Sequence, residues 1–130
     1  MFEWKDSYNT GIQFIDEQHK KLFFIAENIY KLLQDKDIFD KYDKIIVLID
    51  ELKDYTAFHF KNEEDYMQSI KYKKFFTQKV QHDFFIEKLN NIDIYSIDDD
   101  QDEYLRKMLA DVSSWIIDHI LERDTDIPKT

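Results

Sequence analysis

The chain contains no cysteine, and this absence restricts the chemistry it can carry. Without thiols there are no disulfides, no thiolate nucleophile, no iron–sulfur cluster and no cysteine-based zinc site. Any metal must therefore be held by imidazole and carboxylate groups. That ligand set suits iron, zinc or manganese.

Helix-breaking residues are almost absent as well, since Gly11 and Pro128 are the only glycine and proline and both lie near the ends of the 130 residues. A β-protein of this length needs many turns, and turns use glycine and proline often. A chain without them can be helical almost throughout. The length is that of one ordinary domain, so we expect a single all-α domain over residues 1–130.

Long apolar runs are missing too, because a run such as Ile45 to Ile49, which no other exceeds, is far too short to cross a bilayer. Residues 1–10 are acidic and polar and do not resemble a secretory signal, so a cytoplasmic location is expected. The chain has 18 basic and 28 acidic residues, a formal net charge of -10. This charge repels phosphate backbones and anionic membrane surfaces, and neither nucleic acid nor membrane insertion is expected.

Apolar residues recur at steps of three and four in four segments, which predict helices at about 16–33, 39–67, 72–89 and 101–121. Short connections make neighbouring helices antiparallel, so the expected fold is an up-down four-helix bundle. Asp16 is placed to cap or charge-stabilise the first helix. Residues 1–15 are expected to form an extended N-terminal arm anchored by Phe2, Trp4 and Ile12.

Candidate metal ligands are spread over all four predicted helices. The only four histidines are His19, His59, His82 and His119, one on each helix. In an antiparallel bundle these positions can share one level. A lone histidine among apolar residues is more often a hydrogen-bonded core residue than a ligand. The convergence of four histidines is what favours a metal site.

Two carboxylates strengthen this hypothesis. Glu63 follows His59 by four residues, so both side chains share one helix face, and Asp124 follows His119 by five. A carboxylate buried without a cationic partner costs several kcal/mol. The neighbouring acids Glu64 and Asp65 are interpreted as part of a solvated face, as is the run 98–100.

Taken in order, three motifs and one acid make the chain resemble the hemerythrin family, specifically the single-domain bacteriohemerythrins. They are the segments 11–19, 59–64 and 115–120, followed by Asp124. The resemblance implies a four-helix bundle that holds two non-haem irons, bridged by an oxo or hydroxo oxygen and by two carboxylates. It also implies reversible binding of O2, and hence a binding protein rather than an enzyme.

Individual roles follow from matching the motifs. The resemblance implies that His19 and His59 ligate one iron, that His82 and His119 ligate the other, and that two acids bridge the irons. The bridging acids would be Glu63 and Asp124. The residues that match the apolar O2 pocket of the family are Leu22, Trp115, Ile116 and Ile120.

The third predicted helix departs from the family pattern, which there has two histidines four residues apart. Here Gln78 stands where the first should be, and no other histidine can replace it. The second iron would then accept the Gln78 amide oxygen, a water or an open position. A neutral amide oxygen is a weaker donor than imidazole, so looser iron binding and a shifted redox potential are expected.

Several functions stay open at this point. The leading hypothesis is a monomeric O2-binding protein for storage, transport or delivery, with a delivery partner that the sequence does not identify. The alternatives are an iron-dependent redox protein that reacts with peroxide or nitric oxide, and a sensor of O2 or redox state. A single or partly filled metal site, or a bundle without metal, would also be compatible with the residues.

Overall fold

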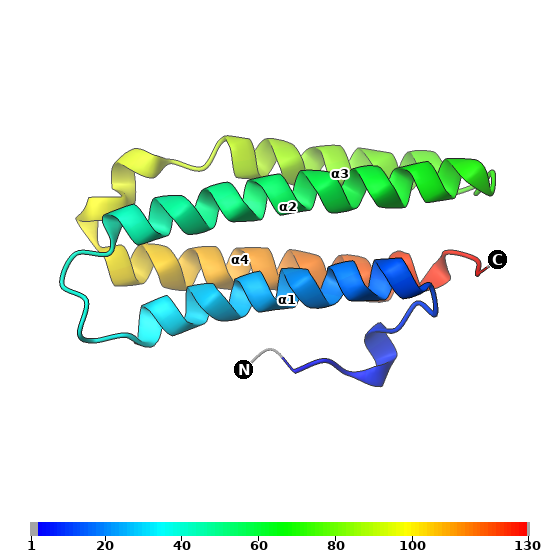
Figure 1. The fold of residues 1–130 in the computed structure, drawn as a ribbon. Coiled ribbons are helices and arrows are strands. Elements are labelled where there is room, and N and C mark those ends of the chain that lie inside the picture. Colours follow the sequence, from blue (N-terminus) through cyan, green and yellow to red (C-terminus); the bar gives the residue numbers. More distant parts are fainter. Residues whose placement is uncertain (1–2, 130) are drawn as a thin grey trace.

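The computed structural model describes residues 3–129, and four long helices dominate it (Figure 1). They are α1 (Gln13–Gln34), α2 (Tyr42–Ser69), α3 (Phe75–Asn90) and α4 (Gln101–Glu122). Three short 3-10 helices accompany them: η1 (Asp6–Tyr8), η2 (Ile94–Asp99) and η3 (Asp124–Asp126). The described residues form no strand. The all-α prediction is confirmed.

The long helices lie side by side and alternate in direction, as expected for a four-helix bundle (Figure 1). α1 packs against α2 and α4, and α2 packs against α3. The start of α1, the end of α2, the start of α3 and the end of α4 therefore meet at one end of the bundle, on the right in Figure 1. Side chains near these four positions can converge.

Apolar stripes at helical spacing build the core. Fully buried side chains recur three or four residues apart in α1 and α2, and each contributes on the order of 1.5–3 kcal/mol when removed from water. They include Ile25, Ile29, Ile45, Ile49 and Leu52. A smaller cluster of Ile12, Ile15, Met67 and Ile127 joins the chain near both termini to the ends of α1 and α2. These contacts fix the helix ends that carry the candidate ligands.

Three helices begin at different residues from those predicted. α1 begins at Gln13 instead of about 16, α2 at Tyr42 instead of about 39, and α3 at Phe75 instead of about 72. Asp16 therefore lies inside the first turn of α1. Its carboxylate accepts hydrogen bonds from the Thr10 N–H at 2.8 Å, the Thr10 hydroxyl at 2.8 Å and the Gly11 N–H at 3.1 Å.

The N-terminal arm is shorter and less extended than predicted, because η1 interrupts it and α1 begins early. Gly11 has a φ of 81°, a left-handed conformation that glycine adopts without strain. Trp4 packs against Phe23 with ring centroids 5.3 Å apart, and Ile12 is buried. The proposed anchor Phe2 lies outside the described residues. Among the helices within residues 3–129, none has the length and apolarity that a membrane span needs.

Removing the Asp16 carboxylate tests its role at the start of α1. Asp16→Ala should lower the free energy of unfolding of the metal-free protein by about 1–2 kcal/mol, because the three hydrogen bonds are lost together. Urea denaturation at pH 7 measures this difference. Asp54→Ala, at an exposed position of α2, is the control and should change stability by less than about 0.5 kcal/mol. Equal effects of the two substitutions would contradict this account of the helix start.

Candidate metal centre

Seven polar side chains are buried together at the end of the bundle where the four helix ends meet. Each is at most 5% exposed. They are His19 of α1, His59 and Glu63 of α2, Gln78 and His82 of α3, His119 of α4, and Asp124 of η3. Polar groups are buried at this density only where they satisfy one another or bind something between them.

The two carboxylate oxygens of Glu63 face different histidines. Oε2 lies 3.6 Å from His19 Nε2 and 3.4 Å from His59 Nε2. Oε1 lies 3.1 Å from His82 Nε2. One side chain thus contacts imidazoles from three helices.

The two carboxylate oxygens of Asp124 also face different histidines. Its Oδ2 lies 3.0 Å from His19 Nε2, and its Oδ1 lies 3.3 Å from His119 Nε2. The residue is the first of η3, which follows the end of α4 after Arg123, and is 1% exposed. The Nε2 atoms of His82 and His119 lie 3.2 Å apart.

The candidate ligands form two groups that share both carboxylates. In each group, one ligand atom from every residue lies within 4.8 Å of the others. The groups are His19, His59, Glu63 and Asp124, and Glu63, His82, His119 and Asp124. Two carboxylates shared between two pairs of imidazoles form a donor set that fits two neighbouring cations.

Electrostatics favour positive charge at this centre. Burial on its own raises the pKa of Asp124, but the nearby imidazoles of His119 and His19 outweigh it, and the pKa falls well below the ordinary value. The pKa of Glu63 is also lowered by nearby histidines, against the effects of burial and of Asp124. Both acids therefore stay ionised, with no water to screen them.

The pKa values of three of the histidines shift in two directions. Burial lowers the pKa of His19, but the nearby carboxylates of Asp124 and Glu63 overcome it and raise the pKa to about 9. The nearby Glu63 carboxylate and the hydrogen bond to Glu64 likewise outweigh burial and raise the pKa of His82 to about 9. Burial dominates at His59, whose pKa falls to about 4. Without metal, protons supply part of the missing positive charge.

Unpaired atoms also favour a cation-binding centre. Among the described residues, both oxygens of Glu63 and both ring nitrogens of His19 are buried without a hydrogen-bond partner. Such orphaned lone pairs are costly in a protein interior, and a metal ion between them would satisfy several at once. The residues present therefore fit a metal centre.

Three of the four histidines are oriented by hydrogen bonds from their outer nitrogen. In each, the Nδ1–H donates to an oxygen on the preceding helix, which leaves Nε2 to face the centre. The pairs are His59 with Gln18 at 2.7 Å, His82 with Glu64 at 2.8 Å, and His119 with Gln81 at 2.9 Å. This arrangement is typical of metal-ligating histidines.

These outer partners were missed by the sequence analysis, and for Glu64 the prediction was wrong. Glu64 is only 15% exposed, accepts the His82 hydrogen bond and lies 3.5 Å from Lys79 Nζ. Its neighbour Asp65 is 59% exposed, as a solvated face requires. Gln18 and Gln81 each stand directly before a histidine, which is a weak signal. Each glutamine accepts a hydrogen bond from the histidine of another helix, and this pairing follows only from how the helices pack.

Gln78 lies inside the centre, one helical turn before His82. Its side chain is 1% exposed, and its Nε2 donates a hydrogen bond to Asp124 Oδ1 at 3.1 Å. Its Oε1 has no hydrogen-bond partner among the described residues. The amide thus occupies the level of the histidines and contacts a carboxylate that both groups share.

A small cavity of about 10 Å³ adjoins the centre. All four residues of the predicted O2 pocket line it: Leu22, Trp115, Ile116 and Ile120. His19, His59, His119 and Asp124 reach it from the centre, and Thr56, Phe60 and Phe85 complete the lining. Its volume restricts any occupant to a very small molecule.

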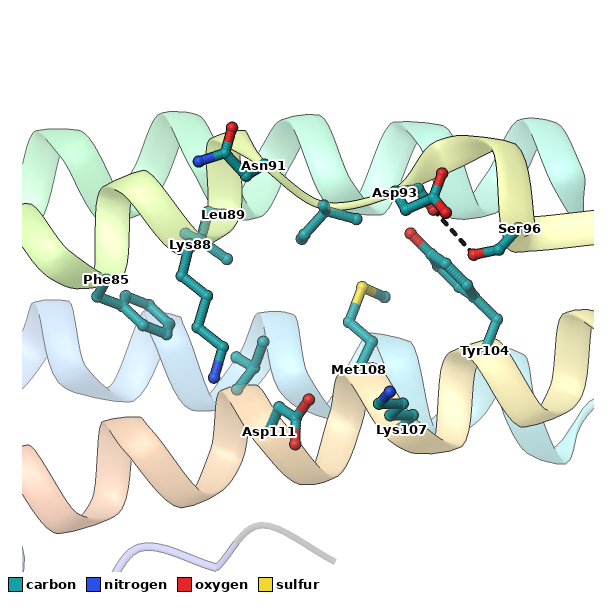
Figure 2. A pocket seen from close by; sticks show the side chains of 12 residues that line it. Phe85, Lys88, Leu89, Asn91, Asp93, Ser96, Tyr104, Lys107, Met108 and Asp111 are labelled. Carbon is teal, nitrogen blue, oxygen red and sulfur yellow. Dashed lines mark hydrogen bonds between the residues drawn. The ribbon is translucent and has the colours of Figure 1, made fainter.

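A larger cavity of about 310 Å³ opens between the end of α3 and the first half of α4 (Figure 2). Phe85 lines both cavities. Its ring stacks on Trp115 with centroids 4.1 Å apart, and Trp115 stacks on His119 at 4.6 Å. Packed aromatic rings thus connect the surface cavity with the centre.

Comparison with known proteins agrees with this geometry. A family profile described as "Hemerythrin HHE cation binding domain" matches residues 10–127, a range that contains all seven residues of the centre. A bacteriohemerythrin of Clostridium acetobutylicum is 52% identical over 126 residues, covering 97% of this chain and 98% of that protein.

More distant relatives match as well. A bacteriohemerythrin of Pseudomonas aeruginosa is 32% identical over 122 residues, covering 93% of this chain and 75% of that protein. A hemerythrin-like protein of Naegleria gruberi is 24% identical over 123 residues, covering 95% of this chain and 87% of that protein. With the profile match and the 52% identity, these findings confirm the resemblance seen in the motifs, and the chain belongs to the hemerythrin family.

Proposed function

We propose that this protein holds two non-haem irons in the buried centre and binds O2 reversibly, for storage, transport or delivery. The observation that carries the proposal is the position of Glu63 and Asp124. Each directs one oxygen towards His19 and the other towards the His82 and His119 pair. That geometry supports two bridging carboxylates between two irons.

The proposed ligand roles follow the two groups. His19 and His59 hold one iron, His82 and His119 hold the other, and Glu63 and Asp124 bridge them. The charges suit a buried site, since two ferrous ions bring four positive charges, and two carboxylates with one hydroxide remove three. The small remaining charge is one that a protein interior tolerates.

The small cavity beside the centre would make the proposed O2 site apolar and closed to bulk water. Two ferrous ions together supply the electrons that reversible O2 binding at such a centre requires. The apolar walls made by Leu22, Ile116 and Ile120 exclude bulk water. A volume of about 10 Å³ limits the occupant to a very small molecule.

Gln78 supports a second candidate function, an iron-dependent reaction with peroxide or nitric oxide. An amide in place of imidazole leaves the iron of His82 and His119 with a weaker ligand, or with an open position that another small molecule can occupy. The unpartnered Gln78 Oε1 supports weak coordination by that oxygen. Its Nε2 at the same time holds Asp124.

Anaerobic reconstitution with ferrous iron separates the two functions. We expect two irons per chain and a coloured species that forms in air and disappears on deoxygenation. The absence of a reversible spectral change would contradict the O2-binding proposal. Sustained peroxide consumption by the iron-loaded protein, lost in Glu63→Ala, would favour the second function.

Substitutions at Gln78 test its contact with the second iron. Gln78→His should retain two irons and lose the second to a chelator about tenfold more slowly, since imidazole is the stronger donor. Gln78→Leu, of similar size, should lose that iron faster than the wild-type protein. Iron release to an excess of chelator measures both rates. Equal release from all three proteins would show that Gln78 does not act on the iron.

Metal binding should release protons at neutral and mildly alkaline pH. The pKa values of about 9 for His19 and His82 mean that both rings are protonated below pH 9 when no metal is bound. A metal ion at Nε2 must displace those protons, so the apparent affinity should rise with pH up to about 9. Anaerobic calorimetry with ferrous iron at pH 8, in two buffers of different ionisation enthalpy, counts the protons. A count of zero would contradict the raised pKa values.

A further inference from the structure

Thr56 presents an unpaired hydroxyl beside the centre. It lies in α2, about one helical turn before His59, and its side chain is 1% exposed. Its Oγ1 is buried without a hydrogen-bond partner among residues 3–129. Valine would fill the same volume without burying a polar atom. The hydroxyl is therefore costly unless something outside the protein pairs with it.

The small cavity is where such a partner would lie. Thr56 lines it, and the side chains of Leu22, Phe60, Ile116 and Ile120 that line it with Thr56 have no group able to form a hydrogen bond. Trp115 stacks its ring between Phe85 and His119. Apart from the candidate ligands, the one hydroxyl in this lining belongs to Thr56.

Two of the three histidines that line this cavity have no donor left for it. The Nδ1–H groups of His59 and His119 are held by Gln18 and Gln81. Their Nε2 atoms face Glu63 and Asp124, at 3.4 and 3.3 Å. A molecule in the cavity thus meets apolar walls on most sides, with the Thr56 hydroxyl on one side and the His19 ring at the centre.

We propose that the Thr56 hydroxyl donates a hydrogen bond to the small molecule that occupies this cavity, and so favours ligands that can accept one. The inference rests on the proposed function, which makes that molecule O2 or a small anion such as azide. Hydrogen bonds are stronger in a dry cavity than in water. This bond exists only with the ligand bound, so its loss should act on the dissociation rate.

Three matched proteins test the proposal: the wild type, Thr56→Val and Thr56→Ser. The probe is azide, bound to the oxidised iron-loaded protein and followed by stopped-flow absorbance. Azide should leave Thr56→Val about tenfold faster than the wild type, equivalent to about 1.4 kcal/mol. Thr56→Ser keeps the hydroxyl and should stay within about threefold of the wild type. The azide stretching frequency should shift in D2O for the wild type but not for Thr56→Val.

Ser113→Ala is the control, because Ser113 Oγ is also buried without a partner but does not line the cavity. It should leave azide dissociation unchanged. The metal-free proteins give an independent readout. Thr56→Val should be at least as stable as the wild type in urea, since the lost hydroxyl had no protein partner. A stability loss that Thr56→Ser restores would overturn the proposal.

The outcomes distinguish the two levels of inference. If the wild type takes up two irons and azide, and Thr56→Val releases azide at the same rate, the role of Thr56 is wrong and the proposed function stands. If the wild type takes up no iron, the proposed function fails, and the role of Thr56 fails with it. Iron analysis of each protein before the azide measurement separates these results.

Discussion

The rest of the structure depends on two ionised carboxylates that have no contact with water. Glu63 and Asp124 are 0% and 1% exposed, and their lowered pKa values keep both negative. Two buried negative charges are tolerated only where positive charge faces them at short distance. The bundle provides this by bringing four helix ends together, each with one histidine. The imidazoles direct their Nε2 lone pairs into the centre. Cations bound there would balance the negative charge of the two carboxylates.

The hydrogen bonds behind the histidines follow the order of the helices. A side chain of α1 holds the histidine of α2, one of α2 holds that of α3, and one of α3 holds that of α4. Within the described residues, the outer nitrogen of His19 in α1 has no such partner. Three of the four histidines are thus fixed in orientation by neighbouring helices. The apolar core must hold each pair of helices in register for these bonds to form, so packing and metal-site geometry are coupled.

The sequence predicted the bundle and brought six candidate ligands into one hypothesis, because four histidines without cysteine leave few ways to build a metal site. It placed three helix starts about three residues away. At α1 the reason is that Asp16 reaches back to Thr10 and Gly11 from inside the first turn. Glu64 was wrongly placed on a solvated face, and Gln18, Gln81 and Thr56 were not assigned. Their roles depend on the rotation of each helix about its axis and on its neighbours, and one sequence contains neither.

The most direct test of the central claim is anomalous diffraction at the iron absorption edge from crystals of the iron-loaded protein. The account predicts two iron peaks per chain. One should lie between His19 and His59, the other between His82 and His119, and both should contact Glu63 and Asp124. A single peak, or two peaks that do not share these carboxylates, would contradict the claim that two buried acids bridge two metal ions.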